Sequence, residues 1–151
     1  MLIGVISDTH GLLRPEAISA LRGLDRILHA GDIGDAGTLA RLREIAPITA
    51  VRGNVDREPW GLELPETEVV EVLGVSIYML HDLGQLDLKP QAAGFRVVVY
   101  GHSHKPAIEE KGGVLYFNPG SAGPRRFRLP LSVGRLLVED GRVSGELIKL
   151  G

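Results

Sequence analysis

The chain has 151 residues, 44% of them hydrophobic and 24% charged, with a net charge of -2 and no cysteine. These values fit one globular domain over residues 1–151 better than two domains split near Pro59, since neither piece would bury much surface. They exclude disulfides and thiolate metal ligands, and they leave no overall basic field and so no strong nucleic-acid signal.

The first third alternates between apolar runs and helical patterns. Leu2–Ile6 is a short apolar run and predicts a buried strand, and Arg26–Ala30 and Ile48–Val51 predict two more. Pro15–Arg22 and Ala36–Ala46 have helical spacing of apolar residues, with proline at a favourable first position in one of them. The order β-α-β-α-β indicates a parallel sheet with covering helices.

The remainder is strand-rich. Arg57–Glu66 carries two prolines and a tryptophan and predicts a loop. Three hairpins and one single strand are predicted after it: Thr67–Val72 with Val75–Leu80, Arg96–Tyr100 alone, Ala107–Glu110 with Val114–Phe117, and Leu131–Val138 with Arg142–Leu150.

Leu2–Ile6 has no basic residue before it and is far shorter than the roughly 20 apolar residues that a membrane span needs. We therefore expect no signal peptide, no membrane partner and a cytoplasmic location.

Metal-competent side chains follow five of the predicted strands. They are Asp8 and His10, Asp32, Asn54, His81, and His102 and His104. Open α/β sheets bind ligands just outside the carboxyl ends of their strands, so we expect all seven to meet at one crevice. The two pairs at i, i+2 support this, since extended backbone places such residues on one face. His29 instead lies inside an apolar strand, and we interpret it as structural.

The number and chemistry of these residues favour two metal ions. Seven candidates exceed the four ligands of a structural zinc site. Imidazole with oxygen ligands suits Mn, Fe, Co, Ni or Zn more than Mg or Ca, and we favour Mn. Two ions about 3.5–4 Å apart need a shared ligand, and Asp32 is the expected bridge because it stands alone at its strand end.

Such a site would attract an anion. Two divalent ions, two carboxylates and one hydroxide leave a net charge near +1, which stabilises charge on phosphoryl oxygens. Metal binding lowers the pKa of water towards ~7, so no side-chain nucleophile is required.

These motifs resemble those of the calcineurin-like metallophosphoesterase superfamily. The matching elements are Asp8-Thr9-His10, Gly31-Asp32-Ile33-Gly34-Asp35, Gly53-Asn54-Val55-Asp56, His81 and Gly101-His102-Ser103-His104. With the small size and Asn118-Pro119-Gly120-Ser121, they look most like the compact bacterial and archaeal phosphodiesterase subgroup.

The resemblance implies a fold, a ligand partition and an activity. The fold is an α/β, four-layer α/β/β/α sandwich of two mixed sheets with helices on the outer faces. One ion would take Asp8, His10, Asp32 and His104, and the other Asp32, Asn54, His81 and His102. A hydroxide bridging the two ions would attack phosphorus in line. Asn54, His81 and His102 are the expected catalytic residues.

Val55 departs from the superfamily pattern, which has histidine there. Valine cannot donate a proton or a hydrogen bond, and this favours phosphodiesters with good leaving groups over monoesters with poor ones. The expected partner is a small phosphodiester substrate, while a homo-oligomer and the physiological ester are left open.

Several further residues have two interpretations. Asp35, Asp56 and Asp82 could orient ligands or could form turns and helix caps. Asn118–Gly123 could steady the metal-binding loops or be a plain turn. Three arginines could touch substrate phosphates, although such a cluster is more often a solvated face; they are Arg125, Arg126 and Arg128. Trp60 could pack over a substrate ring, or it could cover the core or a subunit interface.

Two other functions compete with a phosphodiesterase. One is a non-catalytic scaffold of the same fold, like the retromer subunit that resembles this superfamily but has lost ligand histidines. The other is a metal-dependent nuclease, against which the net charge of -2 argues.

Overall fold

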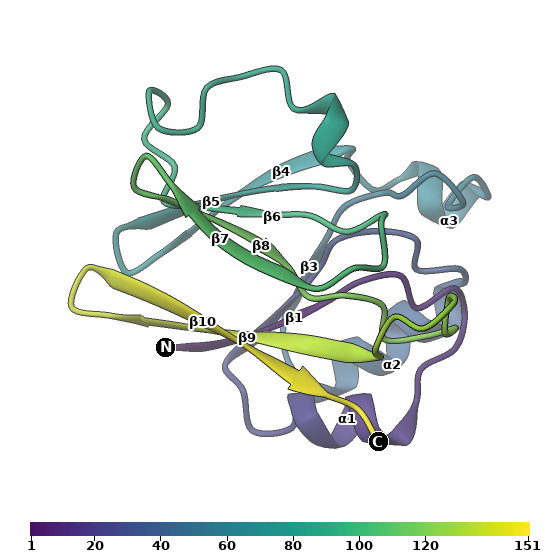
Figure 1. The fold of residues 1–151 in the computed structure, drawn as a ribbon. Coiled ribbons are helices and arrows are strands. Elements are labelled where there is room, and N and C mark those ends of the chain that lie inside the picture. The colour runs from purple at the N-terminus through teal and green to yellow at the C-terminus, as the bar shows by residue number, and fades with distance from the viewer.

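The computed structural model describes residues 1–151 and packs two five-stranded sheets against each other (Figure 1). The first sheet has the order β10-β9-β1-β2-β3, with bounds Arg142–Lys149, Ser132–Glu139, Leu2–Ile6, Arg26–His29 and Ile48–Ala50. The second has the order β4-β5-β6-β8-β7, with bounds Thr67–Val72, Val75–Leu80, Val97–Val99, Val114–Asn118 and Ala107–Lys111.

Both sheets are mixed. In the first, β1, β2 and β3 are parallel and β9 and β10 are antiparallel to their neighbours. In the second, β5, β6 and β8 are parallel, while β4 and β7 pair antiparallel at its two edges. Each parallel set brings its carboxyl ends to one edge, which is what gathers the loops that carry the polar motifs.

The main core lies between the sheets. Fifteen buried residues from both sheets pack there, among them Ile3, Ile77 and Phe117. Phe117 is fully buried, and a Cβ on either Gly134 or Gly145 would collide with its ring. The two glycines therefore leave the space that lets β9 and β10 lie over a phenylalanine of the opposite sheet.

The two outer faces are covered differently. α1 (Pro15–Leu21) and α2 (Ala36–Ile45) pack on the first sheet (Figure 1) through a second cluster of apolar residues. The second sheet is covered by residues 82–95, whose Leu83, Leu86, Leu88 and Phe95 pack on its outward side chains. That segment contains one short 3-10 helix, η1 (Leu83–Gln85). The expected sandwich of two mixed sheets is confirmed, with its full helical layer on one side only.

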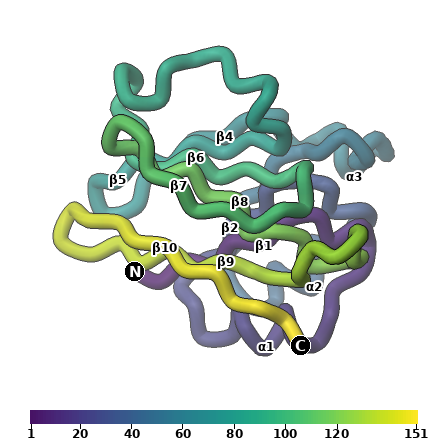
Figure 2. The backbone as a smooth tube through the Cα atoms, in the orientation of Figure 1, coloured from purple at the N-terminus to yellow at the C-terminus, as the bar shows by residue number.

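The predicted elements are present, with boundaries shifted by at most two residues. The one error is the segment 57–66, predicted as loop, where α3 (Pro59–Leu62) forms one turn of helix. Pro59 suits a first helical position, and Trp60 anchors the turn by packing with Leu64 against Ile33 and Leu39. The smooth backbone path is followed most easily in Figure 2. No helix is long and apolar enough to cross a membrane.

Candidate metal centre

The candidate ligands stand on short loops that begin where the strands end. Five of the seven have a left-handed backbone: Asp8 (φ 55°), His10 (48°), Asp32 (56°), His102 (73°) and His104 (63°). Residues other than glycine adopt this conformation rarely and at an energetic cost, and such residues concentrate at functional sites. The loops that follow β1, β2 and β6 therefore carry local backbone strain.

Three side chains form the inner group, which we define as Asp8, His10 and His104. Nε2 of His104 lies 3.4 Å from Oδ1 of Asp8, and Nε2 of His10 lies 3.7 Å from the same oxygen. The two imidazole rings are 5.3 Å apart. One donor atom from each residue falls within 4.8 Å of the others, close enough to hold a single ion.

Asp32 and His81 extend this group toward the second sheet. Nε2 of His81 lies 3.2 Å from Oδ2 of Asp32 and 3.9 Å from Oδ1 of Asp8. Oδ2 of Asp32 is also 3.6 Å from Nε2 of His10. Both carboxylates thus face the imidazoles of His10 and His81, so Asp8 is placed as centrally as Asp32, the bridge expected from the sequence.

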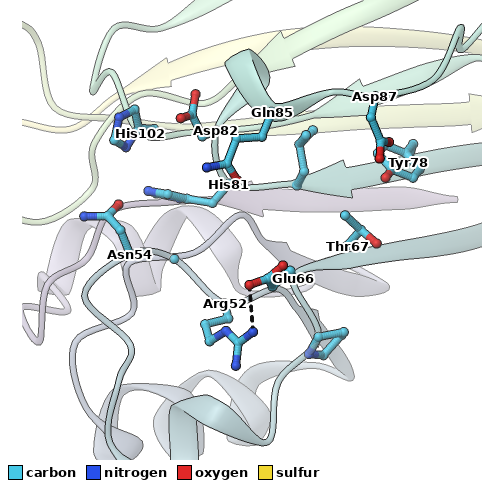
Figure 3. A pocket seen from close by; sticks show the side chains of 13 residues that line it. Arg52, Asn54, Glu66, Thr67, Tyr78, His81, Asp82, Gln85, Asp87 and His102 are labelled. Atoms are coloured by element: carbon cyan, nitrogen blue, oxygen red, sulfur yellow. Dashed lines mark hydrogen bonds and ion pairs between the residues drawn. The ribbon is translucent and has the colours of Figure 1, made fainter.

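Asn54 and His102 form the outer group. Both are exposed, unlike Asp8, Asp32, His81 and His104. The ring of His102 stands edge-on to that of His81 with centroids 5.1 Å apart. Figure 3 shows Asn54 and His102 on either side of the His81 side chain at the mouth of a pocket. His81 thus links the outer group to the rest of the candidate ligands, and His102 belongs to neither tight donor cluster.

Unpaired polar atoms show that the residues suit a metal. Oδ1 of Asp8, Nε2 of His10, Nε2 of His81 and both ring nitrogens of His104 are buried without a hydrogen-bond partner. Buried polar atoms are nearly always paired, and a cluster left unpaired requires an explanation such as an ion. Carboxylate oxygens and imidazole nitrogens converging in this way are the donor set of a transition metal.

Hydrogen bonds behind the ligands fix their orientation. The Ser7 hydroxyl donates to Oδ2 of Asp8 over 2.7 Å, which turns Oδ1 toward the imidazoles. Nδ1 of His81 lies 2.7 Å from the carbonyl oxygen of Ala30, so Nδ1 donates and Nε2 is left free to bind. The backbone N–H of Val55 donates to Oδ1 of Asp32 over 3.0 Å. Ser7 and Ala30 were not predicted from the sequence, because neither is itself a ligand type.

Asp56 joins two ligand loops. Its buried carboxylate accepts hydrogen bonds from the backbone N–H groups of Ile33, Gly34 and Gly53. It therefore supports the loops of Asp32 and Asn54 without touching an imidazole. Asp35 and Asp82 act as caps instead, accepting from Thr38 N in α2 and from Gly84 N in η1.

Two glycines permit the loops to approach one another. A Cβ at Gly53 would overlap the backbone nitrogen of Asp32, and one at Gly101 would overlap the Ser7 hydroxyl. Any larger residue would push apart the strand ends that carry the ligands. The glycine before Asn54 and the glycine before His102 are thus requirements of packing at the centre.

The loop 118–123 braces the centre from the side. Nδ2 of Asn118 donates to the carbonyl of Gly101 and to the Ser103 hydroxyl, each over 3.2 Å. The Ser121 hydroxyl donates to the carbonyl of Asp8 over 3.2 Å. This loop therefore connects the His102–His104 loop to the Asp8–His10 loop, which agrees with the steadying role suggested by the sequence.

The contacts among the candidate ligands favour ionised carboxylates. Burial raises the pKa of Asp8 and of Asp32, but contacts with His10 and His81 outweigh it, and both pKa values lie below the ordinary value. Asp8 raises the pKa of His10 and Asp32 raises that of His81, while burial lowers the pKa of His104. Protons on His10 and His81 compete with a metal, so metal affinity should fall as the pH falls.

His29 lies beneath the centre and outside it. It is fully buried, its Nδ1 accepts from the N–H of Gly31, and its Nε2 lies 3.0 Å from the Thr9 hydroxyl. Burial lowers the pKa of His29 to about 4, so it is neutral at pH 7. Its surroundings are those of a structural histidine.

The remaining candidates divide clearly. Trp60 covers the core beside α2. Arg125, Arg126 and Arg128 are exposed and form no ion pair within 4.0 Å with any carboxylate. Burial lowers the pKa of His104, and the charge of Arg126 contributes to the same shift.

Comparison with known proteins agrees with this geometry. Residues 1–141 match the family model of the calcineurin-like phosphoesterase superfamily domain. The chain belongs to this superfamily. A probable metallophosphoesterase of Methanothermobacter thermautotrophicus is 36% identical over 163 aligned residues, covering 100% of this chain and 94% of that protein. Membership of the superfamily supports a hydrolase that uses divalent metal ions.

Solved structures with the same fold fall into two kinds. An archaeal phosphodiesterase superimposes with a TM-score of 0.81 and 25% identity, covering 98% of this chain and 100% of that one. Vps29 of Chaetomium thermophilum superimposes with a TM-score of 0.80 and 21% identity, covering 99% and 96%. The second likeness concerns the fold alone.

Proposed function

We propose that the protein is a phosphodiesterase that binds two divalent transition metal ions, with Mn favoured, at the seven candidate ligands. The observation that carries this proposal is the convergence of five of these residues in two tight donor clusters, with the buried donor atoms of four of them unpaired. Inner and outer groups together offer more donors than one ion needs.

When bound, the ions would supply a hydroxide nucleophile at neutral pH and stabilise charge during in-line displacement at phosphorus. The chain's own residues prepare the site for this chemistry. Asp8 and Asp32 are held ionised, and His81 presents Nε2 because Nδ1 donates to the Ala30 carbonyl. With two ions and one hydroxide the net charge near +1 suits the single negative charge of a diester.

Val55 supports a diester over a monoester. Its side chain is 44% exposed beside Asn54, where it offers no proton to a leaving group. The alkoxide that leaves an alkyl monoester is a strong base and gains most from such a proton, whereas the aryloxide that leaves an activated aryl diester is a weak base and needs it least. The archaeal structure described as a phosphodiesterase is consistent with this choice.

The test compares bis(4-nitrophenyl) phosphate with an alkyl monoester on Mn-reconstituted protein. We expect faster hydrolysis of the diester, and a loss of more than about 100-fold in Asp8→Asn, because even residues behind metal ligands cost 10–100-fold when removed. Asp35→Asn is the matched control, since it changes a carboxylate that only caps α2. Preference for the monoester, or full activity in Asp8→Asn, would contradict the proposal.

A non-catalytic scaffold is the second candidate, because one fold can host unrelated functions. The intact donor set weighs against a scaffold that binds no metal. A protein that folds, takes up no transition metal and hydrolyses no ester would support the scaffold over the enzyme.

A further inference from the structure

A large polar pocket opens beside the outer group of the centre. Its volume is about 790 Å³, within the range of small-molecule sites. Asn54, His81 and His102 lie at one end (Figure 3), and the unpaired Nε2 of buried His81 belongs to this end. The rest of the lining comes from four segments: Arg52 and Gly53, Pro65 to Thr67, Tyr78 and Leu80, and Asp82, Gln85 and Asp87.

The pocket carries an excess of negative charge. Arg52, its one guanidinium group, is already paired with Glu66 at 2.9 Å and donates to the Leu62 carbonyl. Asp82 uses one oxygen to cap η1, and Asp87 has no hydrogen-bond or ion-pair partner in the protein. Two carboxylates therefore remain without a cation, in a space that adjoins a cation-binding centre.

The end away from His102 combines a carboxylate with an aromatic side chain. Asp87 and Tyr78 both line that end in Figure 3. Carboxylates bind ammonium groups through charge-assisted hydrogen bonds. The exposed Asp87 offers such a carboxylate, whereas the Tyr78 ring is buried and packs against Phe95 with ring centroids 5.1 Å apart. The same carboxylates repel a second phosphate, so a polyanion such as a nucleoside triphosphate or a nucleic acid strand fits this pocket poorly.

We propose that this pocket receives one esterified group of the substrate, and that this group is a small alcohol bearing an ammonium. The inference rests on the proposed phosphodiesterase activity and names its substrate class. The phosphate would lie at the metal centre, the alcohol would pass His81 and His102, and its ammonium would face Asp87 at the far end of the pocket (Figure 3).

The test uses two diesters that differ only in charge, 4-nitrophenyl 2-aminoethyl phosphate and 4-nitrophenyl propyl phosphate. We expect kcat/KM for the amino compound to exceed that for the propyl compound by about fivefold, the upper end for an ion pair open to solvent. Asp87→Asn should bring the ratio of the two values toward one, and added salt should do the same. Asp140→Asn is the matched control, because Asp140 lies in the β9–β10 turn and outside this pocket.

A binding measurement keeps this inference separate from the activity. Isothermal titration of the Mn-reconstituted protein with 2-aminoethyl phosphate and propyl phosphate should show tighter binding of the amino compound, reduced by Asp87→Asn. If neither diester is hydrolysed but this difference is found, the proposed activity fails and the ammonium subsite stands. Equal kcat/KM and equal affinity for the two members of each pair would overturn the subsite.

Discussion

The inner and outer groups of the candidate metal centre differ in burial and in how closely their donor atoms lie together. In the inner group, Asp8 and His104 are buried and held by the loops behind them, and their donor atoms are already close together. In the outer group, Asn54 and His102 are exposed, and His102 belongs to no tight donor cluster. One tight donor cluster lies wholly within the inner group, whereas the outer group lies open toward the pocket. In the proposed two-metal site, the outer group would help to hold the second ion.

This difference suggests how the two positions divide their work. A preformed set of donors binds with less loss of side-chain freedom, so the inner position should hold its ion more tightly. The outer position adjoins the pocket and is where a substrate would first meet the centre. Variants that affect only one of the two positions therefore test whether the two positions differ in metal affinity.

The largest expected effect concerns the two histidines of the same motif. We expect His104→Ala to weaken Mn binding at the tighter site by more than about 100-fold. Changing a residue that only orients a ligand already costs 10–100-fold in metal affinity, and this change removes a ligand itself. His102→Ala should leave that tighter site and weaken the second one. Calorimetric titration of both variants measures this, and equal losses at both sites in the two variants would abolish the distinction between inner and outer groups.

A smaller effect is expected from His29, which lies under the inner group. Its pKa is about 4 in the folded chain against 6.5 for an ordinary histidine. Between these pH values the unfolded state binds more protons, so the free energy of unfolding should fall as the pH drops from 6.5, by up to about 3 kcal/mol at pH 4.

The matched comparison is His29→Gln in metal-free protein, followed by denaturant unfolding across this pH range. The variant should be less stable at pH 7 yet show a shallower loss toward acid pH. Groups such as His10 and His81, whose raised pKa values act in the opposite direction, are common to both proteins and cancel in the difference. If the free energy of unfolding falls equally with pH in the two proteins, His29 is not a buried histidine with a lowered pKa.

The sequence shows where the candidate ligands stand because they follow strands. An apolar run that ends in Asp, His or Asn shows where the strand stops and what it presents, and parallel pairing then gathers these ends. The hairpin of β4 and β5 was predicted with its boundaries for the same reason, since Leu73-Gly74 separates two apolar runs.

The residues that support the ligands and the lining of the pocket could not be predicted from the sequence. Ser7 and Asp56 act through hydrogen bonds to partners 1 to 23 positions away, and such contacts leave no periodic pattern. The pocket lining comes from segments as far apart as Arg52 and His102. Its charge depends on the pairing of Arg52 with Glu66, which only the folded structure reveals.

The central claim is that the seven residues hold two ions, and the metal content of the protein tests it most directly. Protein reconstituted with Mn and freed of excess metal should contain close to two ions per chain by elemental analysis, and one or fewer after His104→Ala. A wild-type protein that folds fully yet retains no transition metal, or that binds no more than one ion at saturation, would contradict the account.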